Sequence, residues 1–591
     1  MNFKHAIVEL FSPTLINLIL FYFPLTSIKM NLETHFDIFK FEMCKFYTLS
    51  FKNLEFKICA DFNAINVVRG KNMKKVSILT AEEAVKLVKD GDTVTTTGFV
   101  ASCNPETLTK ALEKRFLETS FPKNLTLFYP SSQGNRDGKT GGDHFAHEGM
   151  IKRVIAGHYA TAPRLGEMCV SNKCEGYNLP QGALLYLLRD IAGHRIGTLT
   201  EVGLDTFVDP RNGGGKINER TTEDLVEVVE INGKEMLLYK AFPINVAFIR
   251  ATYADEYGNI TFEKEITPLE GTSIAQAAKN SGGIVIIQVE KVVKGGTLDP
   301  RLVKIPGIYV DAVVIANKED QEQSMGQDYE PGISGEAKVI IDNPKPLPLS
   351  AKKIIGRRAA MELEENAVVN LGVGAPEYVA QVASEEGIGD YMTLTVESGP
   401  IGGIPQGGPR FGSSLNPDCL LDQPYQFDFY DGGGLDMAYL GLAQCDENGN
   451  INVSRFGSKI AGCGGFINIT QNSKKVFFCG TFTAGGLKTR IEDGKLIIEQ
   501  EGKERKFIKQ VQQVTFSGRY AVKKGQPVLY ITERAVFELR EDGVHLIEVA
   551  PGIDIQTQIV DLMDFVPKYD KAKVKIMDSR IFREEKMGLK K

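Results

Sequence analysis

A pattern that occurs twice is the strongest constraint on the fold of this chain. In each copy an amphipathic helix is followed by a turn and a short β-branched strand, which ends at Gly98 in the first copy and at Gly372 in the second. A Pro-Glu pair, which suits a helix start, follows each strand. Further along, residues 255–261 (DEYGNIT) are echoed by residues 446–452 (DENGNIN). Because these landmarks keep one order, we infer an internal duplication, with an insertion in the first copy between positions 105 and 255.

Local signals within the two copies predict an α/β fold. Thr80 and Glu83 form a capping box ahead of a helix over 81–88, and Ser350 precedes a second helix that runs to position 363. Alternating strand and helix patterns predict parallel sheets covered by helices, so we expect two duplicated open α/β domains. The expected strands that matter most are 93–97, 367–371 and 392–396.

The domain boundaries follow from length and from proline spacing. A chain of 591 residues is too long for one hydrophobic core. Prolines at 344, 346 and 348 favour an extended connector over 344–349. We therefore expect one domain at 73–343 and a second at 350–591.

Residues 1–72 do not share this pattern and form an atypical N-terminal extension. They are rich in Phe, Ile, Leu, Asn and Lys without a clear period, and the uncharged stretch 10–28 is nearly long enough to span a bilayer. An asparagine and two prolines inside that stretch argue against a membrane helix, and no convincing small-residue cleavage site follows it. We expect Met73 to be the natural start and the protein to have no membrane segment.

The composition argues against several partners and cofactors. A formal net charge of -6 is small for this length and does not indicate a nucleic-acid partner. Nine scattered cysteines fit reduced thiols in the cytoplasm. Cys169 and Cys174 lack a second pair at zinc-site spacing, and His144, His147 and Glu148 do not match a zinc motif, so we expect no metal. The chain also lacks a P-loop and a G-x-S-x-G nucleophile motif, and we expect no cofactor.

The candidate active site is the Gly-rich stretch 392–412, MTLTVESGPIGGIPQGGPRFG. Its first five residues predict a buried strand, which places Glu397 at the carboxyl end of that strand, where open α/β sheets bind ligands. Gly399, Gly402 and Gly403 allow backbone N–H groups to approach a ligand closely. Glu397 can therefore serve as a carboxylate nucleophile. The alternative is a solvated acid in a surface turn.

A second Gly-rich element, residues 371–377 (LGVGAPE), follows another predicted strand. Gly372 and Gly374 free the backbone there, and the Pro-Glu pair suits the first turn of a helix. The unpaired N–H groups of a helix start can hold a phosphate or a developing oxyanion. A plain strand-to-helix turn is the alternative. The stretch is a weak dinucleotide fingerprint, because Glu377 replaces the third glycine.

Two further segments favour structural interpretations. Residues 209–218 (DPRNGGGKIN) form a basic, Gly-rich loop that could contact a phosphate, although a simple surface loop is the preferred interpretation. Residues 425–430 (YQFDFY) look like a strand, and Asp431 and Asp436, which follow, are predicted to be structural caps.

Taken together, these segments resemble the family I acyl-coenzyme A (CoA) transferases, and within them the single-chain propionate/acetate CoA-transferases. The likeness rests on VESGPIGGIPQGG around Glu397, LGVGAPE around Gly374 and DGGGLDMAYLGLAQCDENGNINVS. Two longer stretches match as well, GDHFAHEGMIKRVIAGHYATAP and YNLPQGALLYLLRDIAGHRIGTLTEVGLDTFVDPRNGGGKIN. These segments keep their order from about Met73 to near the C-terminus, so the likeness is specific, and it excludes residues 1–72.

The resemblance implies a pair of open α/β domains of the CoA-transferase type and a homo-oligomer, a dimer or a tetramer. It implies that Glu397 forms a covalent thioester with CoA, and that the backbone of Gly372, Gly374 and Ala375 supplies an oxyanion site. The resemblance assigns no role to three further residues in the matching stretches: His144, Asn178 and Gln181.

The expected activity is CoA transfer between a short-chain acyl-CoA and a free carboxylate such as acetate, propionate, butyrate or lactate. Glu397 is expected to attack the acyl-CoA thioester, giving a mixed anhydride and CoA thiolate. The thiolate then attacks the glutamyl carbonyl and leaves an enzyme-CoA thioester, which predicts ping-pong kinetics without metal or ATP. Two alternatives stay open: an acyl-CoA hydrolase on the same fold, and a nucleotide-binding protein built on the Gly-rich loops.

Overall fold

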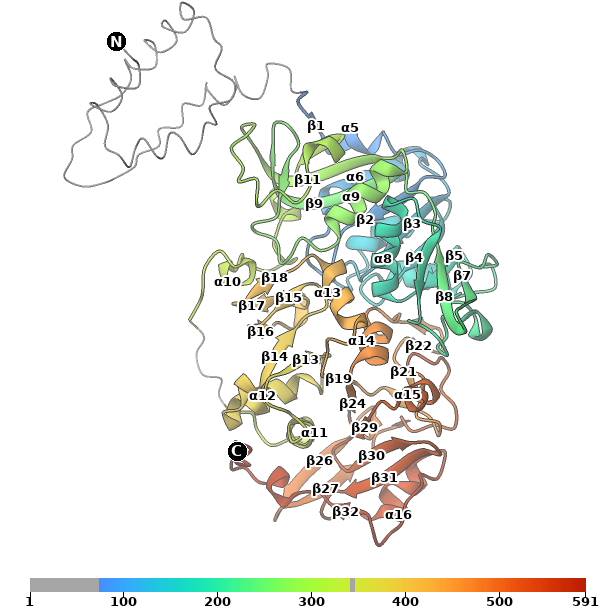
Figure 1. Cartoon of the computed structure of the whole chain (residues 1–591), viewed down its shortest axis with the longest axis vertical. Coiled ribbons are helices and arrows are strands. Elements are labelled where there is room, and N and C mark those ends of the chain that lie inside the picture. Colours follow the sequence, from blue (N-terminus) through green and yellow to red (C-terminus); the bar gives the residue numbers. More distant parts are fainter. Residues whose placement is uncertain (1–73, 341–345, 591) are drawn as a thin grey trace, which may run out of the picture. The chain divides into compact units, whose positions relative to one another are not determined.

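The computed structural model describes residues 74–340 and 346–590, which form an α/β protein with two large sheets (Figure 1). The predicted extension over 1–72 and the start of the predicted connector lie outside these residues, so both boundaries stay predictions. No helix in the described ranges is long and apolar enough to cross a membrane.

The first large sheet belongs to the N-terminal half, and its strands are ordered β1-β12-β11-β9-β2-β3-β4-β5. Neighbours along this path are parallel, and β10 pairs antiparallel with β9. Its strands are β1 (Ser77–Leu79), β2 (Thr93–Thr96), β3 (Leu125–Tyr129), β4 (Ile151–Ala156), β5 (Glu175–Asn178), β9 (Val246–Asp255), β10 (Ile260–Thr261), β11 (Ile284–Val293) and β12 (Ala312–Ile315). The helices of this half are α5 (Ala81–Val85), α6 (Glu106–Thr119), α7 (Pro163–Val170), α8 (Gln181–Ala192), α9 (Gly271–Asn280) and α10 (Pro331–Ser334).

The second large sheet has the order β18-β15-β14-β13-β19-β24-β29-β30-β31-β32. Its central strands β14, β13, β19, β24 and β29 are parallel. Antiparallel pairing adds β15 and β18 at one end and β30 and β31 at the other, and β32 pairs parallel with β31. The strands are β13 (Ala367–Leu371), β14 (Met392–Thr395), β15 (Pro400–Ile401), β18 (Cys419–Leu420), β19 (Met437–Gly441), β24 (Lys475–Cys479), β29 (Val528–Ile531), β30 (Ala535–Arg540), β31 (Gly543–Val549) and β32 (Lys575–Ile576). The helices are α11 (Ala351–Ala360), α12 (Glu377–Glu386), α13 (Gln423–Asp431), α14 (Phe466–Asn472), α15 (Gly518–Lys524) and α16 (Ile555–Gln558).

Small sheets decorate both halves. Three strands of the N-terminal half pair separately in the order β6-β8-β7, and the others form two-stranded ribbons. Their bounds are β6 (Gly197–Thr200), β7 (Val226–Ile231), β8 (Lys234–Lys240), β16 (Ile404–Pro405), β17 (Ser414–Leu415), β20 (Gln444–Cys445), β21 (Ile451–Asn452), β22 (Arg455–Phe456), β23 (Lys459–Ile460), β25 (Thr483–Ala484), β26 (Lys488–Glu492), β27 (Lys495–Gln500) and β28 (Glu504–Arg505). The three-stranded sheet lies within the segment where an insertion was inferred.

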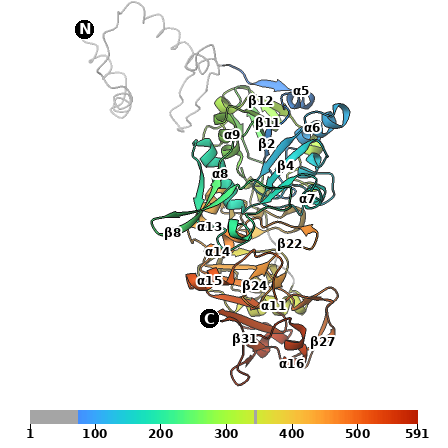
Figure 2. The same ribbon diagram turned by 90° about the vertical axis from the view of Figure 1, so that its right-hand side faces the viewer.

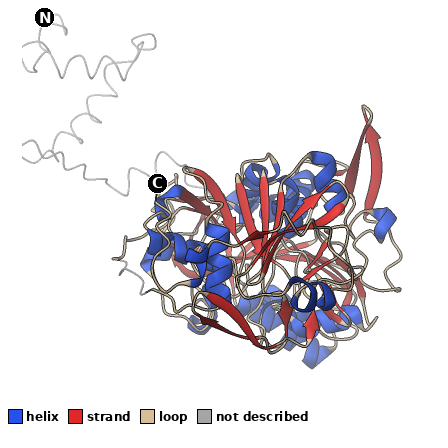
Figure 3. Cartoon of the chain, turned by 90° about the horizontal axis from the view of Figure 1, so that it is seen from below, coloured by secondary structure: helices blue, strands red, loops and turns tan. Residues whose placement is uncertain are grey.

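Both large sheets are covered on their two faces. On β9, Phe248 belongs to one buried apolar cluster and Ile249 to another, because successive side chains point to opposite faces of a strand. On β24, the neighbouring residues Phe477 and Phe478 likewise belong to two different buried clusters. Helices lie on both sides of the strands in Figures 2 and 3. Parallel strands buried on both faces are typical of doubly wound α/β domains, as the sequence predicts.

The inferred duplication is confirmed by topology and by hydrogen bonding. The order β12-β11-β9-β2-β3 in the first sheet corresponds to β29-β24-β19-β13-β14 in the second. The Asp255 carboxylate accepts hydrogen bonds from the backbone and side-chain N–H groups of Asn259. Asp446 accepts the same pair of hydrogen bonds from Asn450. The two DExGNI turns are therefore equivalent structures.

The capping signals also match the structure. The Glu83 N–H donates to Thr80 Oγ1, and the Thr80 N–H donates to Glu83 Oε2, at 3.2 and 3.0 Å. Helix α5 ends at Val85, earlier than predicted, because the next N–H groups bond three residues back instead of four. The Ser350 side chain caps α11, and β13 has the predicted bounds.

One predicted element is wrong. Residues 425–430, predicted as a strand, belong to α13, which has a proline in its first turn. Gln423, Phe427 and Tyr430 are fully buried, whereas Tyr425 and Phe429 are exposed. Burial therefore follows the three- and four-residue spacing of a helix. Aromatic residues are common in strands as well as in helices, so the composition of this segment does not distinguish the two.

Candidate active site

Glu397 lies in a tight turn between β14 and β15, at the carboxyl end of a central parallel strand. The Val396 N–H donates to the Pro400 carbonyl at 2.9 Å, and the Gly399 N–H donates to the Val396 carbonyl at 3.0 Å. Gly399 has a φ of +132°, and a Cβ there would lie 2.1 Å from the Leu421 carbonyl oxygen. The turn therefore requires glycine at this position.

Residues from both halves of the chain hold this turn. Thr267 Oγ1, in the first half, donates to the Ser398 carbonyl at 3.0 Å. The Ser398 hydroxyl donates to the Gly412 carbonyl. A Cβ on Gly412 would lie 2.2 Å from the ring of Phe99, so this backbone packs directly on the end of the first sheet. The contacts fix Glu397 where the two halves meet.

The Glu397 carboxylate is packed closely, and the residue is half-buried. A Cβ on Gly465 would lie 2.0 Å from Glu397 Oε2 and 3.0 Å from Phe427 Cζ, so the carboxylate rests against a bare glycine backbone. Burial raises the pKa of Glu397 to about 7. A carboxylate that is poorly hydrated and close to neutral pKa is typical of functional sites and is a stronger nucleophile than a solvated one.

The glycine loop, defined here as residues 462–465, is held by the first half. The Asn178 side-chain oxygen accepts from the Cys463 N–H at 3.0 Å, and its amide donates to the Gly157 carbonyl at 2.6 Å. The Gln181 N–H donates to the Gly464 carbonyl at 2.9 Å. Asn178 and Gln181, which had no role from the sequence, therefore position the backbone against which Glu397 packs.

The 371–377 loop offers fewer free donors than the sequence suggests. The Gly372 N–H donates to the Tyr439 carbonyl at 2.8 Å as part of the sheet, so this amide is not free to bind an oxyanion, which corrects the expectation for Gly372. In the described parts of the chain, the N–H groups of Gly374 and Ala375 have no hydrogen-bond partner. Helix α12 begins two residues later, so these two amides lie at its N-terminal end.

The three glycines after Glu397 mainly shape the backbone. The N–H groups of Gly399 and Gly402 are bonded to the carbonyls of Val396 and Leu394, so these two are not free donors either. Gly402 and Gly403 have φ values of +74° and +69°, and a Cβ on either would collide with neighbouring atoms at 2.0 to 2.3 Å. Their role in the observed conformation is to permit the turn.

Comparisons with known proteins decide the family. The coenzyme A transferase family profile matches residues 78–316. The acetate CoA-transferase YdiF of Escherichia coli K12 is 46% identical over 516 residues, which cover 87% of this chain and 96% of that protein. The chain belongs to the coenzyme A transferase family. The caffeate CoA-transferase of Acetobacterium woodii is 48% identical to this transferase over 517 residues, covering 86% and 98% of the two chains.

A solved structure supports the same assignment. The crystal structure of the acyl-CoA transferase YdiF from Escherichia coli O157:H7, in a thioester complex with CoA, matches with a TM-score of 0.82 and 45% identity. The match covers 87% of this transferase and 97% of that chain. The predicted two-domain α/β fold and the predicted enzyme class are confirmed.

His144 belongs to a buried ion network of the transferase that does not include Glu397. Its Nε2 is 2.9 Å from Glu106, and its Nδ1 is 2.6 Å from Glu113, which also binds His147. Hydrogen bonds to these two carboxylates outweigh the effect of burial and raise the pKa of His144 to about 9. In the ranges that the structure covers, no three His, Cys, Asp or Glu side chains are grouped to hold a metal ion.

The remaining predicted residues have structural contacts, although not all the expected ones. Asp431 ends α13 and accepts hydrogen bonds from Tyr186 and from two asparagines of α14, and burial raises its pKa to about 6. Asp436 accepts from the Val368 N–H at 2.8 Å. Neither aspartate caps a helix start, so the capping prediction is wrong for both.

The 209–218 loop is only partly a surface loop. The Gly215 carbonyl accepts from the Asn178 N–H at 2.8 Å, which ties the loop to the carboxyl end of β5. A Cβ on Gly215 would lie 2.6 Å from the Asn178 carbonyl oxygen. Arg211 is bonded to the buried Asp209 within the same loop.

The sequence did not predict a polar network that lies next to Glu397. The Tyr430 hydroxyl donates to Thr395 Oγ1 at 2.9 Å and accepts from Gln426 at 2.9 Å and from Asn370 at 3.3 Å. Thr395 is the last residue of β14 and precedes Glu397 by two positions. Burial raises the pKa of Tyr430, and the charge of Glu397 adds to this effect, so the network lies close to Glu397. The sequence signal for this network was a threonine two positions before Glu397. The other residues of the network come from α13 and β13, which are distant in sequence.

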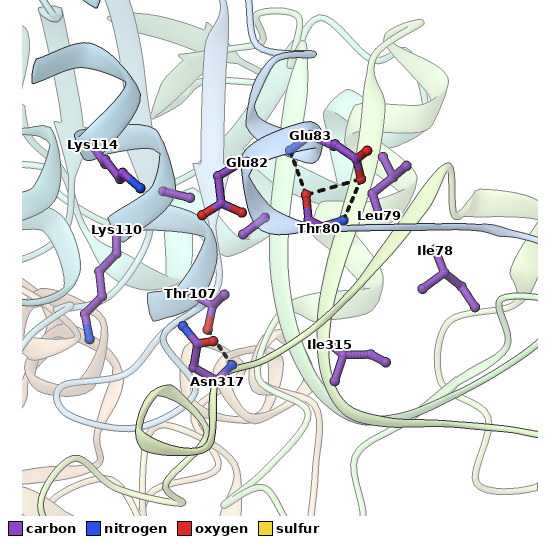
Figure 4. A pocket seen from close by; sticks show the side chains of 12 residues that line it. Ile78, Leu79, Thr80, Glu82, Glu83, Thr107, Lys110, Lys114, Ile315 and Asn317 are labelled. Carbon is purple, nitrogen blue, oxygen red and sulfur yellow. Dashed lines mark hydrogen bonds between the residues drawn. The ribbon is translucent and has the colours of Figure 1, made fainter. Parts of the chain in front are cut away.

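A cleft of 630 Å³ lies elsewhere, between β1, α6 and the end of β12 (Figure 4). Its lining groups are already engaged: Thr80 with Glu83, and Lys110 with Asp320. Lys114, which also lines the cleft, is an exposed surface side chain. The cleft includes no residue of the Glu397 site, so we do not connect it with the reaction.

Proposed function

We propose that this enzyme transfers CoA between a short-chain acyl-CoA and a free carboxylate of the acetate, propionate, butyrate and lactate class, through a CoA thioester on Glu397. The observation that carries the proposal is the closely packed Glu397 carboxylate, held against Gly465 where the two halves of the chain meet, with a pKa that burial raises to about 7. Two relatives add support: one is named for acetate, and the related YdiF structure is described as a thioester complex with CoA.

The proposed reaction proceeds in covalent steps. A Glu397 carboxylate oxygen attacks the acyl-CoA carbonyl, the C–S bond breaks, and an acyl-glutamyl anhydride and CoA thiolate result. The thiolate then attacks the glutamyl carbonyl and expels the first carboxylate, leaving the enzyme-CoA thioester. An incoming carboxylate reverses these steps and departs as the new acyl-CoA.

Each attack produces a tetrahedral oxyanion that needs preorganised donors. Gly374 and Ala375 supply the candidate N–H groups, because both are unpartnered within the described residues and lie at the start of α12. Removing one such donor typically costs about 3 kcal/mol of transition-state stabilisation. Of the three residues expected to supply the oxyanion site, the proposal therefore keeps Gly374 and Ala375 and leaves out Gly372.

The choice of acid is part of the proposal. Relatives of nearly equal identity are named for acetate and for caffeate, so overall identity does not select a small acid over a large aromatic one. The short-chain assignment is tested by comparing kcat/KM for acetate, propionate, butyrate, lactate and caffeate as acceptors. A preference for caffeate would contradict the short-chain assignment without affecting the thioester mechanism.

The decisive assay for transfer is acceptor dependence. We expect propionyl-CoA to be consumed with acetate and not without it, and initial rates at varied concentrations of both substrates to give the parallel lines of ping-pong kinetics. Acetate-independent release of CoA would instead favour the acyl-CoA hydrolase.

Three further properties belong to this proposal. The mechanism needs no metal or other cofactor, so dialysis against a chelator should leave the rate unchanged. The seven cysteines in the described residues are free thiols, which fits the reducing cytoplasm. A homo-oligomer, dimer or tetramer, is expected and can be measured by light scattering.

A further inference from the structure

His158 packs against the glycine loop that contacts Glu397. Its backbone pairs with Gly462. A Cβ on Gly464 would lie 3.7 Å from His158 Cδ2, so the imidazole ring faces this glycine. The next residue, Gly465, touches the Glu397 carboxylate. The imidazole ring, from the first half of the chain, and the Glu397 carboxylate therefore lie against neighbouring residues of one loop.

The opposite edge of the imidazole is fixed by two buried hydroxyl groups. His158 Nδ1 is 2.8 Å from Ser132 Oγ, and Ser132 Oγ is 2.6 Å from Thr161 Oγ1. Ser132 and Thr161 are 6% and 2% exposed. Since Cδ2 is bonded to Nε2 and not to Nδ1, the ring edge that faces Gly464 carries Nε2.

This hydroxyl pair determines which nitrogen carries the proton. In the described residues, the Thr161 hydroxyl has no hydrogen-bond partner other than Ser132. Its hydrogen is satisfied only if Thr161 donates to Ser132, because a buried hydroxyl without an acceptor costs stability. Ser132 then donates to His158 Nδ1, and the neutral ring carries its hydrogen on Nε2. The reverse direction leaves the Thr161 hydrogen unsatisfied.

The ring stays neutral under the conditions of the reaction. Burial, and next the positive charge of Arg136, lower the pKa of His158 to about 4. The imidazole is therefore a fixed hydrogen-bond donor at neutral pH and not a general acid.

A second polar side chain, the amide of Gln181, flanks the same glycine. Gln181 Oε1 lies 3.7 Å from a Cβ on Gly464, and Gln181 Nε2 is buried with no partner among the described residues. Two N–H donors on one side of the nucleophile suit the two oxygens of a carboxylate. The unpartnered amides of Gly374 and Ala375 belong to the second half, at the start of α12, and not to this side.

We propose that His158 is a positioning residue for the acid substrate: its Nε2–H donates to one carboxylate oxygen and orients the acid for attack on the Glu397 thioester. The inference rests on the proposed function and adds a role that concerns the acid and not CoA. Ser132 and Thr161 act through His158 by fixing its tautomer.

The test separates the acid from CoA. The enzyme-CoA thioester is formed with propionyl-CoA, freed of small molecules, and mixed with increasing propionate, and the propionate concentration for half-maximal discharge is measured. We expect His158→Leu to raise this concentration about ten-fold to a hundred-fold, the range for losing one hydrogen bond to a charged group. The dissociation constant of free CoA, measured by calorimetry, should stay within two-fold.

Two further variants keep the test decisive if the leucine variant does not fold. His158→Gln keeps an N–H donor of similar reach and should restore propionate dependence to within about three-fold of the wild type. Ser132→Ala removes the tautomer control and should raise the half-maximal propionate concentration without changing CoA binding. Unchanged propionate dependence in the folded His158→Leu and Ser132→Ala variants would overturn the inference, as would equal weakening of CoA and propionate. Absence of any thioester in the wild type would instead refute the proposed function.

Discussion

Gly465→Ala tests whether the position of the Glu397 carboxylate controls the reaction. Gly465 has φ -82° and ψ -3°, which alanine adopts without strain, so the substitution acts only through the added methyl group. That Cβ would lie 2.0 Å from Glu397 Oε2. We expect the variant to fold and to form the enzyme-CoA thioester much more slowly.

The size of the effect follows from the required displacement. Non-bonded atoms do not approach a Cβ within 3.0 Å, so the carboxylate has to move by at least 1.0 Å (3.0 minus 2.0). The buried ring of Phe427, 3.0 Å from the same point, limits the directions available. A misplacement of about 1 Å typically slows an enzymatic step about a hundred-fold, which is about 2.7 kcal/mol of barrier.

The assay is single-turnover formation of the thioester from propionyl-CoA, followed by quenched-flow mass spectrometry. Gly389→Ala is the matched control, because a Cβ there meets Ser384 only at ordinary contact distances of 3.7 Å and more. Thermal unfolding of both variants shows whether the fold is kept. A Gly465→Ala enzyme that is folded and forms the thioester at the wild-type rate would refute the argument.

Three other predictions follow from the site. Glu397→Asp shortens the nucleophile and should convert transfer into acyl-CoA hydrolysis; a variant with full transferase activity and no added hydrolysis would contradict this. Since only the ionised carboxylate attacks and burial holds the Glu397 pKa near 7, the rate of thioester formation should rise with pH through about 7 and level off above it; a flat profile from pH 5 to 9 would refute this. Asn178→Ala removes the side-chain hydrogen bonds to Cys463 and Gly157, and should cost about 1–3 kcal/mol of unfolding free energy and slow transfer; unchanged denaturant midpoints would contradict that role.

The parts of the fold that depend on local sequence could be predicted. The capping box at Thr80, the strand Ala367–Leu371 and the position of Glu397 at a strand end follow from propensity, turn residues and periodicity, which act over a few residues. Helix α13 was missed because an aromatic segment carries both strand and helix signals, and burial on one face decides between them.

Features that depend on distant partners could not be predicted. Whether the Gly372 N–H is free depends on the pairing of β13 with β19, and Tyr439 is remote in sequence. Asn178 binds Cys463 across 285 positions, and no local pattern encodes that contact. The sequence therefore indicated the candidate nucleophile but not the residues that position it.

The duplication places different chemistry at equivalent strand ends. Strand β3 in the first sheet corresponds to β14 in the second, and the residues that follow them are Ser131 and Ser132 in one half and Glu397 in the other. Ser131 contacts Gln423 of the second half, and Ser132 binds His158. One copy thus carries the proposed nucleophile at this strand end, and the other carries serines that bind Gln423 and His158.

The most direct test of the central claim is peptide-level mass spectrometry of the enzyme after incubation with propionyl-CoA and no acceptor, with Glu397→Gln as the control. We predict CoA attached to the peptide that contains Glu397, its loss on addition of acetate, and no adduct in the control. An adduct on another residue, or rapid transfer by the Glu397→Gln enzyme, would contradict the proposed mechanism.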